Sequence, residues 1–193
     1  IGKQIALKLA AAGADIAVLI ADPTPFGLND LKLSVDMCRS MGLEPVIIVN
    51  RAEYRDNKLK EYCEEEDLEV IGEIPDDRKI AETYSKGDLI VNKLDEYKEI
   101  FNDIADKIEK VGLEKRKVKK PTERKYRDIT IKSSGLKQTS AGSKKSKELV
   151  VISGKGGTGK TSLMASLAAL ANKPVLADCD VDAADLHLIT EPT

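Results

Sequence analysis

The stretch from Leu149 to Thr161 reads Leu-Val-Val-Ile-Ser-Gly-Lys-Gly-Gly-Thr-Gly-Lys-Thr. It opens with a β-branched apolar run, Leu149–Ser153, which predicts a buried strand. It is followed by the segment Ser162–Asn172, whose regularly spaced Leu and Ala residues predict a helix. Between strand and helix, the pattern G-x-x-x-x-G-K-[ST] is met by Gly154, Gly159, Lys160 and Thr161. The sequence therefore predicts a phosphate-binding loop in its usual context, with a plain glycine-rich turn as the alternative.

The residue types of this loop suit phosphate chemistry. Glycines let successive backbone N–H groups converge on phosphate oxygens, and the start of the following helix adds partial positive charge. Lys160 would reach the β- and γ-phosphates, and the Thr161 hydroxyl would ligate Mg²⁺. The residues expected to bind phosphate are Gly154, Gly156, Gly157, Thr158, Gly159, Lys160, Thr161 and Ser162.

Composition sets outer limits on the function. The chain has 193 residues, 41% of them hydrophobic, and its net charge of −2 gives no argument for nucleic acid as a partner. No apolar run approaches the eighteen residues of a membrane span. The cysteines Cys38, Cys63 and Cys179 lack ligand spacing and indicate free thiols in a reducing cytoplasm. The single histidine, His187, has no neighbours with which to build a metal site.

The first 111 residues alternate between expected strands and helices. Apolar runs predict buried strands at Ile16–Ala21 and Val46–Val49. A third strand is expected at Glu69–Ile74, ended by Pro75. Helices are expected at residues 1–13, 28–41, 58–66, 77–85 and 93–111. In the last of these, one apolar stripe is formed by positions 94, 97, 101, 104, 108 and 111. This alternation predicts an α/β fold with a parallel, doubly wound sheet.

The remaining residues divide into a linker and a second α/β segment. Residues 112–147 hold thirteen Lys or Arg against three acids and are rich in Ser and Gly, which predicts a basic flexible linker. A basic arm that binds nucleic acid or anionic lipid is the alternative, but Tyr126 is its lone aromatic residue. Residues 148–193 contain the phosphate loop, a second expected strand at Pro174–Ala177 and an expected helix at Ala183–Ile189. Both ends of the chain look cut, so we expect a fragment of a longer protein.

The phosphate loop carries a second lysine, Lys155, directly after its first glycine. Gly-Lys-Gly-Gly-Thr-Gly-Lys-Thr resembles the deviant Walker A loop of the MinD/ParA/Mrp ATPases, relatives of the nitrogenase iron protein. The resemblance implies a SIMIBI-like P-loop NTPase fold in which Lys155 reaches the partner's nucleotide, and ATP makes the dimer the active species. Asp178-Cys-Asp180 matches the Asp-x-Asp of that family, which implies that Asp180 orients the attacking water or a Mg²⁺-bound water, with Asp178 in support.

The catalytic residues implied are thus Lys155, Lys160 and Asp180, and the Mg²⁺ ligands are Thr161 and Asp180. The stretch from Asp180 to Leu188 looks most like the branch that carries an inserted ferredoxin-type segment, with Ala184-Asp185 in place of its usual Pro-Asn. A 4Fe–4S cluster would lie in a segment outside this chain.

The N-terminal part resembles the late half of the same family. Asp22-Pro-Thr-Pro-Phe-Gly-Leu-Asn-Asp-Leu-Lys32 looks like its strand-to-helix signature. Val-Ile-Ile-Val-Asn50-Arg51 matches the strand that ends in the adenine-binding Asn, whose carboxamide suits the edge of adenine. Ile74-Pro-Asp-Asp-Arg78 and residues 84–91 match the stretch near the base, which adds Pro75 and Asp76 to the expected nucleotide contacts.

The order of the two halves is inverted relative to the family. Residues 1–111 resemble the C-terminal half of one ATPase domain, and residues 148–193 resemble the N-terminal half of another. A head-to-tail fusion of two ATPases and a circular permutant are the two explanations. Docking of the halves as one sheet would place Leu149–Ser153 beside Ile16–Ala21, then Val46–Val49 and Glu69–Ile74. Burial of apolar strand faces favours this arrangement.

The function implied by the resemblance is an ATP-hydrolysing switch that works as a homodimer or tandem pseudo-dimer. Its client would be a protein concerned with metal clusters, electron transfer or positioning. The alternatives are a module that holds nucleotide without turnover, because the family's Asp-x-Pro-Pro-Gly segment is absent, and nucleic-acid association through residues 115–147. The helix at 93–111 has a polar face balanced in sign, so we expect it to pack on the domain rather than bind a membrane.

Overall fold

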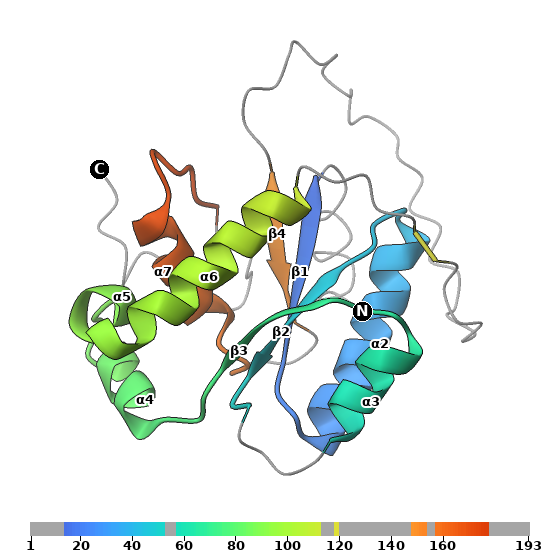
Figure 1. Cartoon of the computed structure of the whole chain (residues 1–193), viewed down its shortest axis with the longest axis horizontal. Helices are drawn as coiled ribbons and strands as arrows, with labels where there is room; N and C mark the ends of the chain where they lie inside the picture. Colours follow the sequence, from blue (N-terminus) through green and yellow to red (C-terminus); the bar gives the residue numbers. More distant parts are fainter. Residues whose placement is uncertain (1–13, 53–56, 113–117, 120–147, 154–156, 178–193) are drawn as a thin grey trace.

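The computed structural model describes residues 14–52, 57–112, 118–119, 148–153 and 157–177, and within them strands and helices alternate (Figure 1). In chain order the elements are β1 Ile16–Ala21, α2 Pro25–Ser40, β2 Val46–Asn50, α3 Lys58–Glu65, β3 Val70–Ile74, α4 Arg78–Ser85, α5 Ile90–Lys93, α6 Asp95–Val111, β4 Leu149–Ile152 and α7 Lys160–Leu170. The helices expected at residues 1–13 and 183–189 lie outside the described residues.

The strands form one parallel sheet in the order β3-β2-β1-β4. The last strand in sequence, β4, lies beside the first, with Ile16 opposite Leu149 and Leu19 opposite Ile152. On the other side of β1, Val18 faces Val46 of β2, and β2 in turn pairs with β3. This order confirms the docking predicted for the two segments, because the strand before the glycine-rich loop pairs with Ile16–Ala21.

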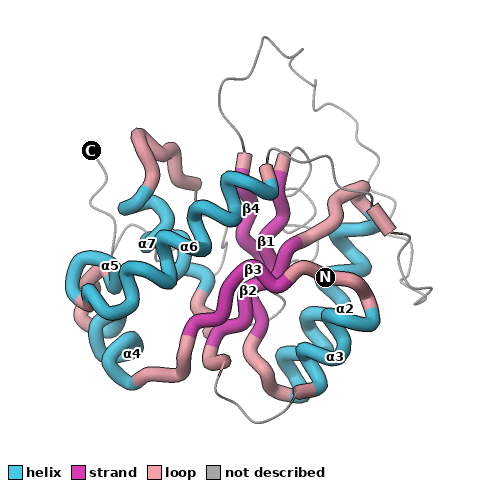
Figure 2. Tube along the Cα trace, in the orientation of Figure 1, coloured by secondary structure: helices cyan, strands magenta, loops and turns pink. Residues whose placement is uncertain are grey.

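Helices cover both faces of the sheet, as predicted for a doubly wound α/β fold (Figure 2). Helices α2 and α3 lie on one face, and α4 to α7 lie on the other (Figure 1). Each face has its own apolar core. Successive side chains of β1 point to opposite faces of the sheet, so Val18 and Ile20 belong to one core and Ala17 and Leu19 to the other. All six residues of β1 are buried, which explains its continuous apolar sequence.

Helix α6 confirms the amphipathic stripe expected at its positions. Its buried residues are Tyr97, Phe101, Ile104, Ile108 and Val111. The helix begins at Asp95 rather than at residue 93, because the non-helical backbone of Leu94 (φ −123°, ψ 87°) separates it from the short helix α5. Its acid-rich polar face points to solvent while the stripe packs on the sheet, as expected of a helix that belongs to the domain.

Helix α2 begins at Pro25, three residues before the expected start. Thr24 caps it, because its hydroxyl accepts a hydrogen bond from the Gly27 amide at 3.0 Å. Proline suits the first helical position, where no amide donor is needed. The sequence Thr-Pro-Phe-Gly therefore belongs to the helix start, whereas the helix was expected only from Leu28.

The strand expected at Pro174–Ala177 is absent. Helix α7 ends at Leu170, Lys173 has a left-handed backbone (φ 54°), and the side chain of Val175 is 97% exposed. A strand is stable only where a neighbour completes its hydrogen-bond ladder, and no described strand lies beside these residues. The apolar composition of Pro174–Ala177 was therefore not enough to predict a strand.

Gly112, Val118 and Lys119 of the expected linker are described, and Lys119 contacts the domain. The Lys119 amide donates to Glu44 at 2.9 Å, and its ammonium donates to the Glu66 carbonyl at 2.9 Å. Glu44 and Glu66 also hold the buried guanidinium of Arg39, with contacts of 2.8 and 2.5 Å. This ionic cluster precedes β2 and β3, so Val118 and Lys119 lie at the amino-terminal edge of the sheet.

Candidate functional site

The opposite, carboxyl-terminal edge of the sheet collects polar residues from all four strands. Asp22 follows β1, Asn50 ends β2, Asp76 follows β3 and Ser153 follows β4. Helix α7 also begins at this edge, shortly after β4. Parallel α/β sheets bind their ligands outside the carboxyl ends of the strands, so this edge is the candidate site.

The described part of the glycine-rich loop forms a tight turn into α7. Gly157 and Gly159 have positive φ angles of 77° and 94°, which glycine adopts without steric cost. The Leu163 amide donates to the Gly159 carbonyl at 3.0 Å and closes the first helical turn. Such a turn aims several amides and the positive end of the helix dipole at one point, as an anion site requires.

The first turn of α7 holds three of the predicted site residues. Lys160, Thr161 and Ser162 occupy its first positions and are half-buried, whereas Thr158 before them is buried. A lysine and a hydroxyl at a helix start provide a cation for phosphate and an oxygen ligand for Mg²⁺. The predicted residues Gly154, Lys155 and Gly156 lie outside the described residues, as do Asp178 and Asp180.

Asn50 lies against this loop although it is 108 residues away in sequence. Its side-chain Nδ2 donates to the Thr158 carbonyl at 2.9 Å. A Cβ placed on Gly159 would lie 2.6 Å from the same Nδ2 atom. The structure thus brings together the residue expected to bind the base and the loop expected to bind phosphate. The hydrogen bond itself was not predicted.

Arg51 and the residues after β3 flank Asn50 on the same edge. Arg51 has a left-handed backbone (φ 59°), and its Nε lies 4.0 Å from the Asp76 carboxylate. Both side chains are more than half exposed (53% and 60%), so this ion pair is weak and open to a ligand. Pro75 is half-buried beside them.

The chain after Pro75 is held in place by the capped start of helix α4. Asp77 caps this helix, because its carboxylate accepts from the Lys79 amide at 2.7 Å. The Tyr97 hydroxyl of α6 donates to the same carboxylate. This hydrogen bond, with the one from the Lys79 amide, lowers the pKa of Asp77, so the capping group is ionised at neutral pH.

Asp22 is a site residue that the sequence analysis did not select. Its side chain is 3% exposed, and its Oδ1 accepts a hydrogen bond from the Thr24 hydroxyl at 3.1 Å. Gly27 packs so closely that a Cβ there would lie 1.9 Å from Oδ1. The sequence did offer a signal for Asp22. An acid directly after a fully apolar strand lies at the carboxyl-terminal edge of the sheet, where the candidate site is.

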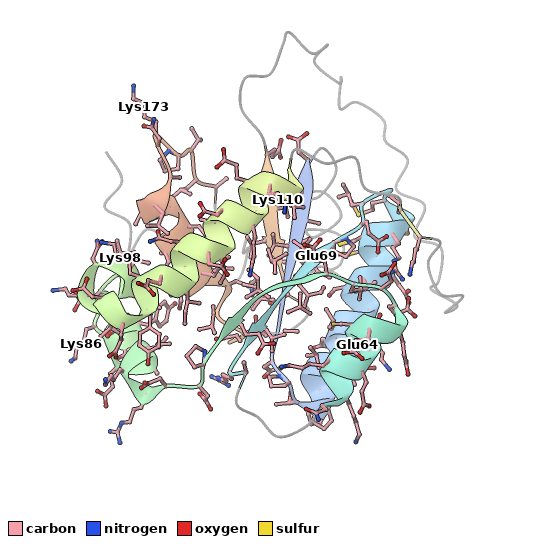
Figure 3. The ribbon with its side chains drawn as sticks, viewed as in Figure 1. Glu64, Glu69, Lys86, Lys98, Lys110 and Lys173 are labelled. Carbon is pink, nitrogen blue, oxygen red and sulfur yellow. The ribbon has the colours of Figure 1, made fainter. Side chains whose placement is uncertain are left out.

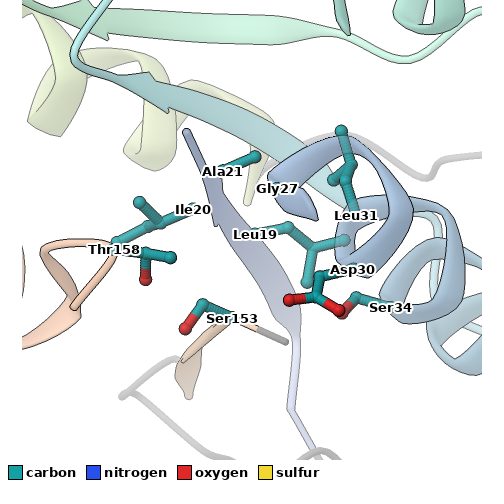
Figure 4. A pocket seen from close by; sticks show the side chains of 9 residues that line it. All are labelled: Leu19, Ile20, Ala21, Gly27, Asp30, Leu31, Ser34, Ser153 and Thr158. Atoms are coloured by element: carbon teal, nitrogen blue, oxygen red, sulfur yellow. The ribbon is translucent and has the colours of Figure 1, made fainter. Parts of the chain in front are cut away.

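A small pocket lies beside the end of β1 (Figure 4). Ser153 and Thr158 lie on one side of the strand, and Asp30 and Ser34 of α2 lie on the other. Its volume of about 10 Å³ is close to the minimum for one water molecule. This pocket is too small for a phosphate group.

No group of three or more His, Cys, Asp or Glu side chains among the described residues could hold a metal ion. No helix in the same part of the chain is long and apolar enough to cross a membrane. A Mg²⁺ ion held by Thr161 and phosphate oxygens needs no such acidic cluster, so Thr161 remains compatible with the predicted ion.

Comparisons with known proteins give a limited result. No protein-family model matches the chain, and no solved structure matches it significantly. An uncharacterized protein of Methanocaldococcus jannaschii is 26% identical over 99 residues, which is 51% of this chain and 30% of that protein. The chain therefore spans less than a third of that relative's length, and the relative's name carries no function.

Proposed function

We propose that this chain is part of a P-loop ATPase of the MinD-like class, which binds Mg-ATP and, in the complete protein, hydrolyses it as a dimer. The observation that supports this most is the contact between Asn50 and the glycine-rich turn. Two segments that were expected to bind opposite ends of one nucleotide meet at 2.9 Å on the carboxyl edge of the sheet. A plain glycine-rich turn would also use positive-φ glycines, but it would not need this neighbour.

In this proposal the first turn of α7 binds the triphosphate. Its amides and Lys160 would neutralise phosphate charge, and Thr161 would hold Mg²⁺ together with Asp180. Magnesium would supply charge neutralisation at the phosphate oxygens. Ser162 lies in the same turn, where its backbone amide is one of those without a helical partner.

The other proposed roles follow from the resemblance. Asp180 would orient the attacking water, and Lys155 would contact the partner's nucleotide. Asn50, Arg51, Pro75 and Asp76 would surround the base, where the exposed side chains of Arg51 and Asp76 leave room for it. The partners proposed are a second copy or a tandem repeat and a protein client. A 4Fe–4S cluster in a further segment of the complete protein belongs to the same proposal.

We also propose a cytoplasmic location. Cys38 and Cys63 are free and buried in the structure. Thiols that persist unpaired suit a reducing compartment. This argument uses only these two described cysteines.

Equilibrium dialysis with labelled ATP and Mg²⁺ tests nucleotide binding, with Lys160→Ala as the variant. Loss of one charge-assisted contact should weaken ATP binding by roughly 10- to 100-fold. Lys98→Ala is the matched control, because Lys98 projects from α6 on the outer surface (Figure 3). Equal ATP binding by all three proteins, or by none, would contradict the proposed site.

Phosphate release then separates the ATPase from a binding module without turnover. If the complete protein is an ATPase, it releases phosphate, and the Lys160→Ala substitution removes most of that release. ATP binding by the complete protein without release above the Lys160→Ala background favours the module. Absence of the Asp-x-Pro-Pro-Gly segment from the complete protein would be the physical reason in that case.

A further inference from the structure

We infer that Asn50 is a positioning residue for the phosphate loop, so that it sets affinity for the triphosphate itself and does more than contact the base. This inference rests on the proposed function, because it concerns the same site. It differs from the role expected for Asn50, which was recognition of adenine.

The hydrogen bond from Asn50 fixes one peptide plane of the loop. Its Nδ2 donates to the Thr158 carbonyl at 2.9 Å, and the Thr158 side chain is 3% exposed. In a trans peptide the carbonyl and the next amide point in opposite directions. The Gly159 N–H therefore points away from Asn50. Any rotation of this peptide would turn that amide and break the hydrogen bond.

Gly159 and Asn50 fit each other closely. Gly159 has φ +94°, and the place of a Cβ there is occupied by Nδ2 of Asn50 at 2.6 Å. The left-handed backbone starts α7, whose first residue is Lys160. A side chain that packs under this glycine and bonds the preceding carbonyl therefore holds the helix start, with Lys160 and Thr161, in one orientation.

The anchor that carries Asn50 is rigid. Asn50 is the last residue of β2 and pairs with Ile74 of β3. The Ala52 amide donates to the Ile74 carbonyl at 3.0 Å, which fixes the chain on the other side of Arg51. The preceding β2 residue, Val49, is buried. The side chain of Asn50 thus links β2 to the loop.

Binding of inorganic tripolyphosphate distinguishes loop positioning from base recognition, because this ligand has phosphates but no base. We would measure Mg-tripolyphosphate and Mg-ATP affinities by calorimetry for the full chain and for Asn50→Leu, which removes the donor at similar size. Asn102→Leu is the matched control on the exposed face of α6. If circular dichroism shows that Asn50→Leu does not fold, Asn50→Ser replaces it, because the serine side chain is too short to reach Thr158.

The inference predicts that removing the Asn50 donor weakens tripolyphosphate binding about three- to tenfold, the range for one neutral hydrogen bond. Asn102→Leu should leave it unchanged. If ATP affinity falls more than tripolyphosphate affinity, the result agrees with the inference, because Asn50 would then contribute to binding of both the base and the phosphates. Unchanged tripolyphosphate affinity in the folded variants would overturn it, even if ATP binding fell. Failure of the unsubstituted chain to bind either ligand would instead overturn the proposed function.

Discussion

Ile152→Ala is the sharpest test of how β4 joins the sheet. Ile152 is the last residue of β4, is 1% exposed and pairs with Leu19 of β1. Its side chain belongs to the apolar cluster under α2 and α3. If β4 is a true member of the sheet, truncation of this side chain removes packing from the core of the whole domain.

The magnitude follows from the atoms removed. Isoleucine to alanine deletes three carbon groups, worth about 0.8 kcal/mol each in transfer from water, or about 2.4 kcal/mol together. A residual cavity adds to this, so the expected loss in the free energy of unfolding is about 2–5 kcal/mol. Since a domain of this size has a stability of roughly 5–15 kcal/mol, the change is a large part of the total.

Urea unfolding followed by circular dichroism measures this loss. With a slope of roughly 1–3 kcal/mol per molar urea, the midpoint should fall by about 1 M or more. Val175→Ala is the matched control from the same part of the chain, because Val175 is 97% exposed and its truncation should change stability by less than about 0.5 kcal/mol. An effect of Ile152→Ala as small as that of the control would refute the pairing of β4 with β1.

Three further predictions concern buried groups. Arg39→Met leaves the Glu44 carboxylate, 7% exposed, without its guanidinium and should cost about 3–5 kcal/mol in urea unfolding at pH 7. Burial, aided by nearby acids, raises the pKa of Cys38 to about 12 and of Cys63 to about 11. The contribution of the two neutral, buried thiols to the free energy of unfolding should be complete below about pH 9 and should decline as the pH rises to these values. Iodoacetamide at pH 8 should label both thiols far more slowly in the folded than in the urea-unfolded chain. Gly27→Ala forces a Cβ against the carboxylate after β1 and should cost about 1–3 kcal/mol by the same unfolding assay.

Each of these has a clear contrary result. Equal stability of Arg39→Met and the parent would mean that the ionic cluster is not buried in solution. Equal labelling rates in the folded and unfolded chain would mean that the two thiols are accessible. A Gly27→Ala variant as stable as the parent would mean that the turn after β1 is looser than the close contact with Asp22 implies.

Most of the fold was predictable because its two central strands, β1 and β2, are buried on both faces. Ile16–Ala21 and Val46–Val49 are continuous apolar runs, and such runs with intervening helices indicate a parallel sheet. The position of β4 beside β1 came from the resemblance to a known family. Pro174–Ala177 shows the limit of pattern alone, because an apolar segment forms a strand only where a neighbour offers hydrogen bonds.

The backbone of the candidate site was predictable where local sequence decides it. Gly159 and Lys160 stand at a helix start, as the motif requires. Individual side-chain contacts between distant segments were not predictable. The hydrogen bond from Asn50 to Thr158 and the buried carboxylate of Asp22 depend on how the strands align. One sequence carries no information on such alignment.

Titration calorimetry of the full chain with Mg-ATP tests the central claim most directly, because the start of α7 must bind a triphosphate if the account is right. We predict saturable binding of one nucleotide per chain and its loss in Lys160→Ala. Absence of binding heat across several temperatures, from a chain that circular dichroism shows to be folded, would contradict the account.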